Sequence, residues 1–195
     1  MIEIVLADPP WMHTGSQTKM AAAGKEYACL SVKDMARVPV ADMCARQAVC
    51  FMWATCPRLD DAMNLLHAWS FNYCGIPFIW RKTTNSGKPI NGQGVRPTLV
   101  KPTVELLIAG VKKGRSRPFP ILNEGMPQVI EHPRPGKHSH KPQVFHDLIV
   151  ELLGDRERIE LFARRNTDGW SCTGLELDGL DFMDQADMED AFQCN

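Results

Sequence analysis

The stretch Ile2-Glu3-Ile4-Val5-Leu6-Ala7-Asp8-Pro9-Pro10-Trp11 joins a short apolar run to a rigid polar turn near the start of the chain. Its β-branched and aliphatic residues predict a buried strand over residues 2–7. The two prolines end this strand because proline has no N–H group for a sheet ladder. Asp8 therefore follows directly after a buried strand, where parallel α/β sheets hold their ligands.

Strand and helix patterns alternate along the rest of the chain. The apolar runs predict further strands over residues 47–54, 72–80, 104–111 and 158–163, with a short one near 128–131. Helical spacing predicts helices near residues 32–37 and over 58–70 and 144–153. This alternation predicts an α/β fold with a mainly parallel sheet. The long loop over residues 83–103 is typical of a functional segment.

The composition is that of an ordinary globular domain. The chain has 195 residues, of which 44% are hydrophobic and 23% charged, and this length predicts one domain. No apolar run is long enough for a membrane span, and the amino terminus lacks the basic segment of a signal peptide. The seven cysteines form no Cys-x-x-Cys pair. We therefore expect free thiols in a reducing cytoplasm, that of a bacterium or a phage-infected cell.

The formal net charge of −1 conceals an uneven distribution along the chain. Residues 176–195 carry seven acidic side chains and no basic one, whereas residues 81–141 carry twelve Lys or Arg against three Glu. The basic stretch predicts a face that binds a polyanion, although solvated surfaces give the same pattern. We expect a domain over residues 1–179 and an acidic tail over 180–195.

The Asp-Pro-Pro-Trp turn has the groups that a planar base with an exocyclic amine requires. The Asp8 carboxylate and the Pro9 carbonyl accept hydrogen bonds, and both prolines fix the backbone. Trp11 offers a flat face for stacking. Two acceptors on the amine of adenine would localise its lone pair and stabilise the transition state of an attack by that nitrogen. The alternative is an ordinary turn followed by a core tryptophan.

Two other groups of residues give weaker evidence of a functional role. His132, His138, His140 and His146 lie close in sequence, but their spacing matches no common zinc motif and no cysteine pair accompanies them. We therefore predict no metal site. Trp53 and Trp69 fall on predicted core positions, which favours packing over a role as stacking platforms.

Nine short motifs occur in one order along the chain and carry a resemblance to a known family. They are Asp8-Pro9-Pro10-Trp11; Tyr27 with Leu30-Ser31 and Met35; Phe51-Met52-Trp53-Ala54-Thr55; Ala68-Trp69-Ser70-Phe71; Phe78-Ile79-Trp80-Arg81-Lys82; Glu105-Leu106-Leu107; His138-Ser139-His140-Lys141-Pro142; Glu160-Leu161-Phe162-Ala163-Arg164; and Gly169-Trp170. In these motifs the chain resembles the DPPW-type N6-adenine methyltransferases. This family includes the catalytic subunit of the eukaryotic mRNA adenosine methyltransferase and many bacterial and phage enzymes.

The resemblance implies a Rossmann-like methyltransferase fold that uses S-adenosylmethionine as methyl donor. It implies a catalytic role for Asp8, Pro9, Pro10 and Trp11. It implies that Tyr27 contacts the target base. It implies cofactor contacts for Asp8, Lys141, Arg164, Asn166 and Glu176. The last motif of the family is altered, because Gly174-Leu175-Glu176 has leucine where an amide side chain is expected.

A nucleic-acid substrate gives the basic stretch a function. Its candidate phosphate contacts are Lys82, Lys88, Arg96, Lys101, Lys112, Lys113, Arg115 and Arg117. A duplex target would require base flipping, because the N6 atom of adenine lies inside the stack. We expect DNA ahead of RNA, since the chain is short and has no RNA-binding extension. RNA methylation and a catalytically silent relative that binds nucleic acid or a partner are the alternatives. A homodimer would enlarge the binding surface.

Overall fold

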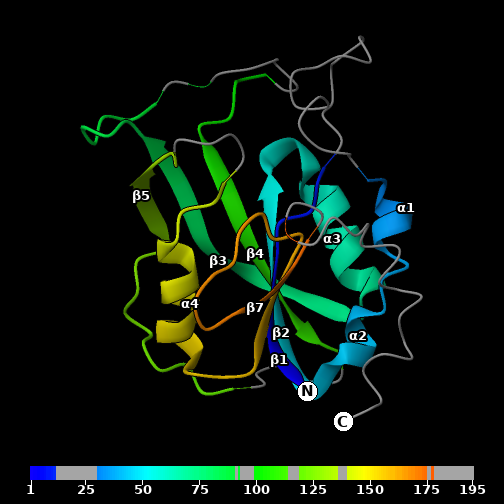
Figure 1. The fold of residues 1–195 in the computed structure, drawn as a ribbon. Coiled ribbons are helices and arrows are strands. Elements are labelled where there is room, and N and C mark those ends of the chain that lie inside the picture. The colour runs from blue at the N-terminus through cyan, green and yellow to red at the C-terminus, as the bar shows by residue number, and fades with distance from the viewer. Residues whose placement is uncertain are drawn as a thin grey trace.

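The strand predicted from the first residues lies inside a seven-stranded sheet (Figure 1). The computed structural model describes residues 1–11, 30–90, 92, 99–113, 119–135, 140–174 and 177. In chain order the elements are β1 (Ile2–Ala7), α1 (Val32–Met35), α2 (Val40–Met43), β2 (Cys44–Thr55), the 3₁₀ helix η2 (Cys56–Arg58), α3 (Leu59–Ala68), β3 (Phe71–Thr83), β4 (Val104–Lys112), β5 (Val129–Pro133), α4 (Val144–Leu153), β6 (Arg158–Leu161) and β7 (Ser171–Thr173).

The strand order across the sheet is β5-β3-β4-β2-β1-β6-β7. Only β4 runs antiparallel to its neighbours in this described sheet, so the predicted mainly parallel sheet is confirmed. The carboxyl ends of β1, β2, β3 and β6 consequently meet the amino end of β4. We call this the Asp8 end of the sheet, and the other the opposite end.

Alternating side chains place a separate core on each face of the sheet. On one face Val5 and Ala7 pack with Leu65 and Leu66 of α3. On the other face Leu6 packs with side chains of α4. Figure 1 shows these layers, with α4 on one side of the sheet and α1 to α3 on the other. Asp8 comes two residues after Leu6, and alternate residues of a strand point to the same face. The Asp8 side chain therefore points to the α4 face.

Most predicted elements are present, with shifted ends. The strand expected over 47–54 is β2, which begins earlier, at Cys44. The strand expected over 158–163 ends at Leu161. The sequence did not indicate α2 or β7. No helix among the described residues has the length and apolarity that a membrane crossing requires. The predicted acidic tail over 180–195 lies outside the described residues and stays a prediction.

Candidate active site

Asp8 lies in a buried ionic cluster of five side chains: Asp8, Lys82, Glu105, Lys141 and Arg164. The Lys141 ammonium donates to Asp8 Oδ1 at 2.6 Å, and its nitrogen lies 3.6 Å from Glu105 Oε2. Arg164 Nε lies 4.0 Å from Asp8 Oδ2. Lys82 donates to Glu105. The Asp8 and Lys141 side chains are only 10% and 9% exposed, so water does little to screen their attraction.

The sheet topology explains why these distant residues meet. Lys82 is the penultimate residue of β3, and Glu105 is the second residue of the adjacent β4. Lys141 precedes α4 by three residues, and Arg164 follows β6 by three. The amide of Asp8 donates to the Leu161 carbonyl at 3.2 Å, which fixes the ends of β1 and β6 to each other. The cluster therefore brings together side chains from the Asp8 end of β1, β3, β4 and β6 and from the segment that precedes α4.

The charges of the cluster are unequal, because three cations face two carboxylates. Burial raises the pKa of the Asp8 carboxyl, and Lys141 and Arg164 offset this rise only in part. Burial also acts to raise the pKa of Glu105, but Lys141 and Lys82 outweigh it and hold that pKa below its ordinary value. Burial disfavours the charged form of Lys141, yet Asp8 and Glu105 raise its pKa overall. The excess positive charge suits a carboxylate ligand.

Two contacts hold the segments that carry Lys141 and Arg164. Arg165 donates to the Gln143 amide oxygen at 3.2 Å and to the Lys141 carbonyl at 3.4 Å. Farther into the core, His146 Nε2 of α4 lies 2.7 Å from Glu160 Oε2 of β6. This histidine–glutamate pair is buried. Both contacts join the start of α4 to the end of β6 and so position the two cations that flank Asp8.

The turn after β6 has an unusual backbone. Phe162 has a φ of 60°, a left-handed conformation that is uncommon for a bulky residue. Its ring stacks on Trp69 with the ring centroids 6.3 Å apart. Gly174 approaches the Ala163 backbone so closely that a Cβ atom would overlap it. Such over-determined backbone is typical of functional sites, and here it directs Arg164 towards Asp8.

Trp11 does not have the surroundings expected of a stacking surface. It is 9% exposed and belongs to the core on the α3 face, and its indole N–H donates to the Trp53 carbonyl at 3.0 Å. The backbone N–H of Trp11 donates to the Pro9 carbonyl at 2.8 Å, which leaves that oxygen one further lone pair. Trp11 therefore supports the turn, and its role in the active site stays a prediction, while the Pro9 carbonyl keeps an acceptor position.

Aromatic rings line the α4 side of the ionic cluster. The Lys141 nitrogen lies 5.5 Å from the centroid of Trp53, and the Lys82 nitrogen lies 5.0 Å from that of Trp80. Trp53 is 2% exposed and Trp69 1%, so the prediction that both are core residues is confirmed. The rings exclude water beside the cluster and strengthen its charge interactions.

The structure does not bring all predicted site residues together. Lys82, Lys141 and Arg164 join Asp8, while Asn166 is exposed just beyond Arg164. Tyr27, Arg96, Arg115, Arg117 and Glu176 lie outside the described residues. Lys112 and Lys113 lie at the opposite end of the sheet, since Lys112 is seven positions beyond Glu105 along β4, about 23 Å at 3.3 Å per residue.

Lys112 has a structural role that its sequence context did not show. Its ammonium donates to the carbonyls of Ala41, Cys44 and Ala45 at 2.7, 2.9 and 3.2 Å. These carbonyls belong to the junction between α2 and β2. The ammonium is therefore engaged within the protein, and a phosphate contact of Lys112 stays a prediction.

Replacing Lys112 with methionine should therefore affect stability rather than binding. We expect the free energy of unfolding to fall by about 1–3 kcal/mol, because the carbonyls lose a charged donor. Urea unfolding measures this loss. Lys113→Met is the control, because the Lys113 side chain is exposed and makes one long contact, 3.5 Å to the His67 carbonyl. If Lys112→Met leaves stability unchanged but flattens the salt dependence of nucleic-acid binding, Lys112 contacts phosphate after all.

Glu105 is the member of the cluster that sequence reasoning missed as a functional residue. The available signal was a glutamate at the start of an otherwise apolar strand, in the motif Glu105-Leu106-Leu107. Among the described residues, no group of three or more His, Cys, Asp or Glu is placed to hold a metal ion.

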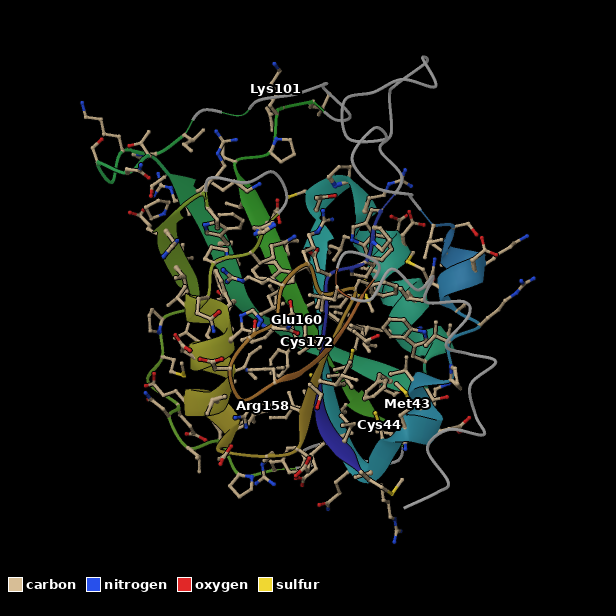
Figure 2. The ribbon with its side chains drawn as sticks, viewed as in Figure 1. Met43, Cys44, Lys101, Arg158, Glu160 and Cys172 are labelled. Carbon is tan, nitrogen blue, oxygen red and sulfur yellow. The ribbon has the colours of Figure 1, made fainter. Side chains whose placement is uncertain are left out.

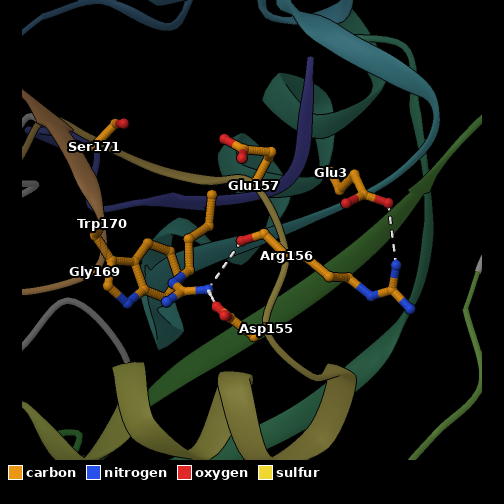
Figure 3. A pocket seen from close by; sticks show the side chains of 8 residues that line it. Glu3, Asp155, Arg156, Glu157, Gly169, Trp170 and Ser171 are labelled. Atoms are coloured by element: carbon orange, nitrogen blue, oxygen red, sulfur yellow. Dashed lines mark hydrogen bonds and ion pairs between the residues drawn. The ribbon is translucent and has the colours of Figure 1, made fainter.

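A concavity of about 550 Å³ lies at the opposite end of the sheet, beside the start of β1 and β6. Figure 3 shows two pairs of charged side chains at its wall. Arg156 contacts Glu3 at 3.1 Å, and Arg158 contacts Asp155 at 2.5 Å. These two pairs lie at the end of the sheet remote from Asp8, so the concavity is separate from the ionic cluster.

Comparison with known proteins defines the class to which this fold and cluster belong. Residues 2–176 match the MT-A70 family. The chain is 29% identical over 192 residues to the type II methyltransferase M.MunI of a Mycoplasma species, covering 90% of this chain and 77% of the relative. It is 31% identical over 186 residues to the N6-methyladenosine RNA methyltransferase MTA1 of Pyricularia oryzae, covering 89% of this chain and 46% of the relative.

A mammalian protein shows the same relationship. The chain is 26% identical over 198 residues to the N(6)-adenine-specific methyltransferase METTL4 of Mus musculus, covering 93% of this chain but 39% of the relative. The fold and these matches therefore identify a methyltransferase of the Rossmann-like α/β class. The chain belongs to the MT-A70 family.

Proposed function

We propose that this chain transfers the methyl group of S-adenosylmethionine to the N6 atom of adenine in DNA. The observation that carries the proposal is the buried Asp8 carboxylate at the carboxyl end of β1, held between Lys141 and Arg164 beside the Pro9 carbonyl. Relatives whose names specify N6 of adenine or adenosine support the same target atom.

The chemistry follows from the acceptors at this turn. The Asp8 carboxylate and the second lone pair of the Pro9 carbonyl would accept the two N–H bonds of the adenine amine. That arrangement concentrates the nitrogen lone pair opposite its hydrogen-bonded protons, towards the methyl group. The N6–carbon bond forms as the sulfur–carbon bond breaks, and N6 then releases one proton to solvent. S-adenosylmethionine supplies an electrophilic methyl group on a sulfonium ion.

The donors around Asp8 fit the polar groups of S-adenosylmethionine. Lys141 and Arg164 would hold its carboxylate, because the ionic cluster carries one more cation than carboxylates. Asp8 would orient the Lys141 side chain for this contact. The exposed Asn166 and, as a prediction outside the described residues, Glu176 would bind ribose hydroxyls.

DNA is the preferred substrate because the chain covers 77% of the type II methyltransferase M.MunI but only 46% of the RNA methyltransferase MTA1. RNA is the second candidate, supported by the 31% identity to MTA1. A silent relative is the third, and calorimetry with S-adenosylmethionine separates it from both enzymes. Neither a homodimer nor a partner chain is needed for the contacts described above.

The experiment supplies methyl-labelled S-adenosylmethionine with separate pools of DNA and RNA, then maps the modified base by mass spectrometry. We expect N6-methyladenine in DNA. Label that enters RNA alone would favour the second candidate. Label on another atom, or no transfer despite cofactor binding, would contradict the proposal.

A further inference from the structure

Two adjacent apolar side chains project from the protein near the Asp8 end of the sheet. Leu99 is 96% exposed and Val100 is 74% exposed. Leu99 is the most exposed of the large hydrophobic side chains in the described residues. A single exposed leucine is ordinary, but two consecutive exposed side chains of this kind beside a candidate active site indicate a binding surface.

The segment that carries them is attached to the Asp8 end. Two residues beyond Lys101, the Thr103 carbonyl accepts the Lys82 amide of β3 at 3.4 Å, and β4 then begins. On the other side, Gly92 lies so close to Lys101 that a Cβ atom would overlap it. Figure 2 shows Lys101 beyond the ends of β3 and β4, remote from Met43 and Cys44 at the opposite end.

Two exposed lysines lie at the same end of the sheet as this apolar pair. Lys101 follows it directly, and Lys88 lies exposed in the turn after β3, where Thr84 donates to the Lys88 carbonyl at 2.8 Å. Two exposed carboxylates also lie at this end: Glu131, which is paired with Arg81 at 2.9 Å, and Asp60 at the start of α3. An apolar projection with cationic flanks is complementary to a duplex, which has an apolar base stack between two rows of phosphates.

The N6 atom of the target adenine must be able to reach the Asp8 carboxylate. Asp8 is 7% exposed, so a base must leave its helix to bring N6 to this carboxylate. We propose, resting on the proposed function, that Leu99 enters duplex DNA at the position that the flipped adenine vacates, with Val100 beside it. Lys88 and Lys101 hold the phosphates on either side. Leu99 thus replaces the lost stacking and determines activity on duplex DNA.

The test compares Leu99→Ala with the unchanged protein on duplex and single-stranded DNA of one mapped target sequence. We expect kcat/KM on the duplex to fall roughly tenfold to a hundredfold, because an unstacked step then lacks its apolar filler. The rate on the single strand should stay unchanged. The variant Leu99→Met, unlike Leu99→Ala, should keep the duplex activity of the unchanged protein. The fluorescence of 2-aminopurine at the target position should rise with the unchanged protein and stay low with Leu99→Ala.

Leu122→Ala is the matched control, since Leu122 is 63% exposed and lies beside the end of α4, where its amide donates to the Leu152 carbonyl. This variant should behave as the unchanged protein on both substrates. Equal losses on duplex and single strand by Leu99→Ala would overturn the inference, as would a full 2-aminopurine signal. A change of oligomeric state with an unaltered ratio of duplex to single-strand rates would assign Leu99 to a contact between copies and overturn it.

The outcome for the unchanged protein separates this inference from the function on which it rests. Transfer to single-stranded DNA alone would overturn the role of Leu99 while leaving adenine methylation intact. Transfer to no DNA would overturn both.

Discussion

Replacing Asp8 with asparagine should lower the rate of methyl transfer by about 10²- to 10³-fold, the effect of removing one hydrogen-bonding group aimed at a transition state. Asparagine keeps the size of the side chain but loses the charge that draws the amine protons. Its amide would also turn an N–H towards Lys141, which now contacts Asp8 at 2.6 Å. Single-turnover transfer from labelled S-adenosylmethionine measures the effect on the chemical step.

Two controls give this result its meaning. Glu131→Gln removes an exposed carboxylate that pairs with Arg81 at the same end of the sheet, and it should leave the rate unchanged. Calorimetry should show that Asp8→Asn binds S-adenosylmethionine with an affinity close to that of the unchanged protein. Equal losses of binding and transfer would place Asp8 in cofactor binding alone, and retained turnover would remove it from the mechanism.

The pH dependence of the reaction provides an independent check on the same carboxyl. Burial raises the pKa of Asp8 above its ordinary value of 3.8. Because the ionised form is the acceptor, the transfer rate should fall on the acid side at a higher pH than an ordinary aspartate would require. The fall should have a slope of one proton. The residual activity of Asp8→Asn should lack this acid limb.

Replacing Lys141 with methionine should lower the free energy of unfolding by about 3–5 kcal/mol, because it leaves the buried Asp8 carboxylate with only the more distant Arg164. Asp8 loses its contact at 2.6 Å, and Glu105 keeps only Lys82. The pKa of Lys141 is raised in the folded protein, so its contribution is fully present below the pKa of an unfolded lysine and disappears as the pH rises through the folded value. Urea unfolding at neutral pH therefore measures the whole effect.

A double-mutant cycle isolates the interaction between Asp8 and Lys141. The variant with both Asp8→Asn and Lys141→Met should be more stable than the sum of the two single losses, because neither charge is then left alone. Arg81→Met is the surface control, and breaking its exposed pair with Glu131 should cost less than about 1 kcal/mol. A loss this small for Lys141→Met would show that the buried pair does not form in solution.

Local patterns in the sequence predicted the elements that bury a continuous apolar face. β1 is six consecutive residues with an apolar majority, and α4 has helical spacing with proline before it and glycine after it. β7 has only three residues, and it is a strand because β6 offers it a parallel partner. A three-residue segment contains no periodicity from which that pairing could be inferred.

The candidate site was predictable where a residue adjoins a recognisable strand end or a family motif. Asp8, Lys141 and Arg164 met that condition, and the structure gathers them. Lys112 did not, because charge along the chain does not say at which end of a strand a side chain lies. Glu105 was missed since its importance comes from Lys82 and Lys141, which reach it only through the antiparallel pairing of β3 with β4 and the approach to α4.

The position of the target amine tests the central claim most directly. A crystal structure of the protein with S-adenosylhomocysteine and a DNA oligonucleotide that contains the mapped adenine would show it. We predict N6 within hydrogen-bonding distance, about 2.7–3.2 Å, of both an Asp8 carboxylate oxygen and the Pro9 carbonyl. An adenine bound elsewhere, with Asp8 still enclosed by Lys141 and Arg164, would contradict the account.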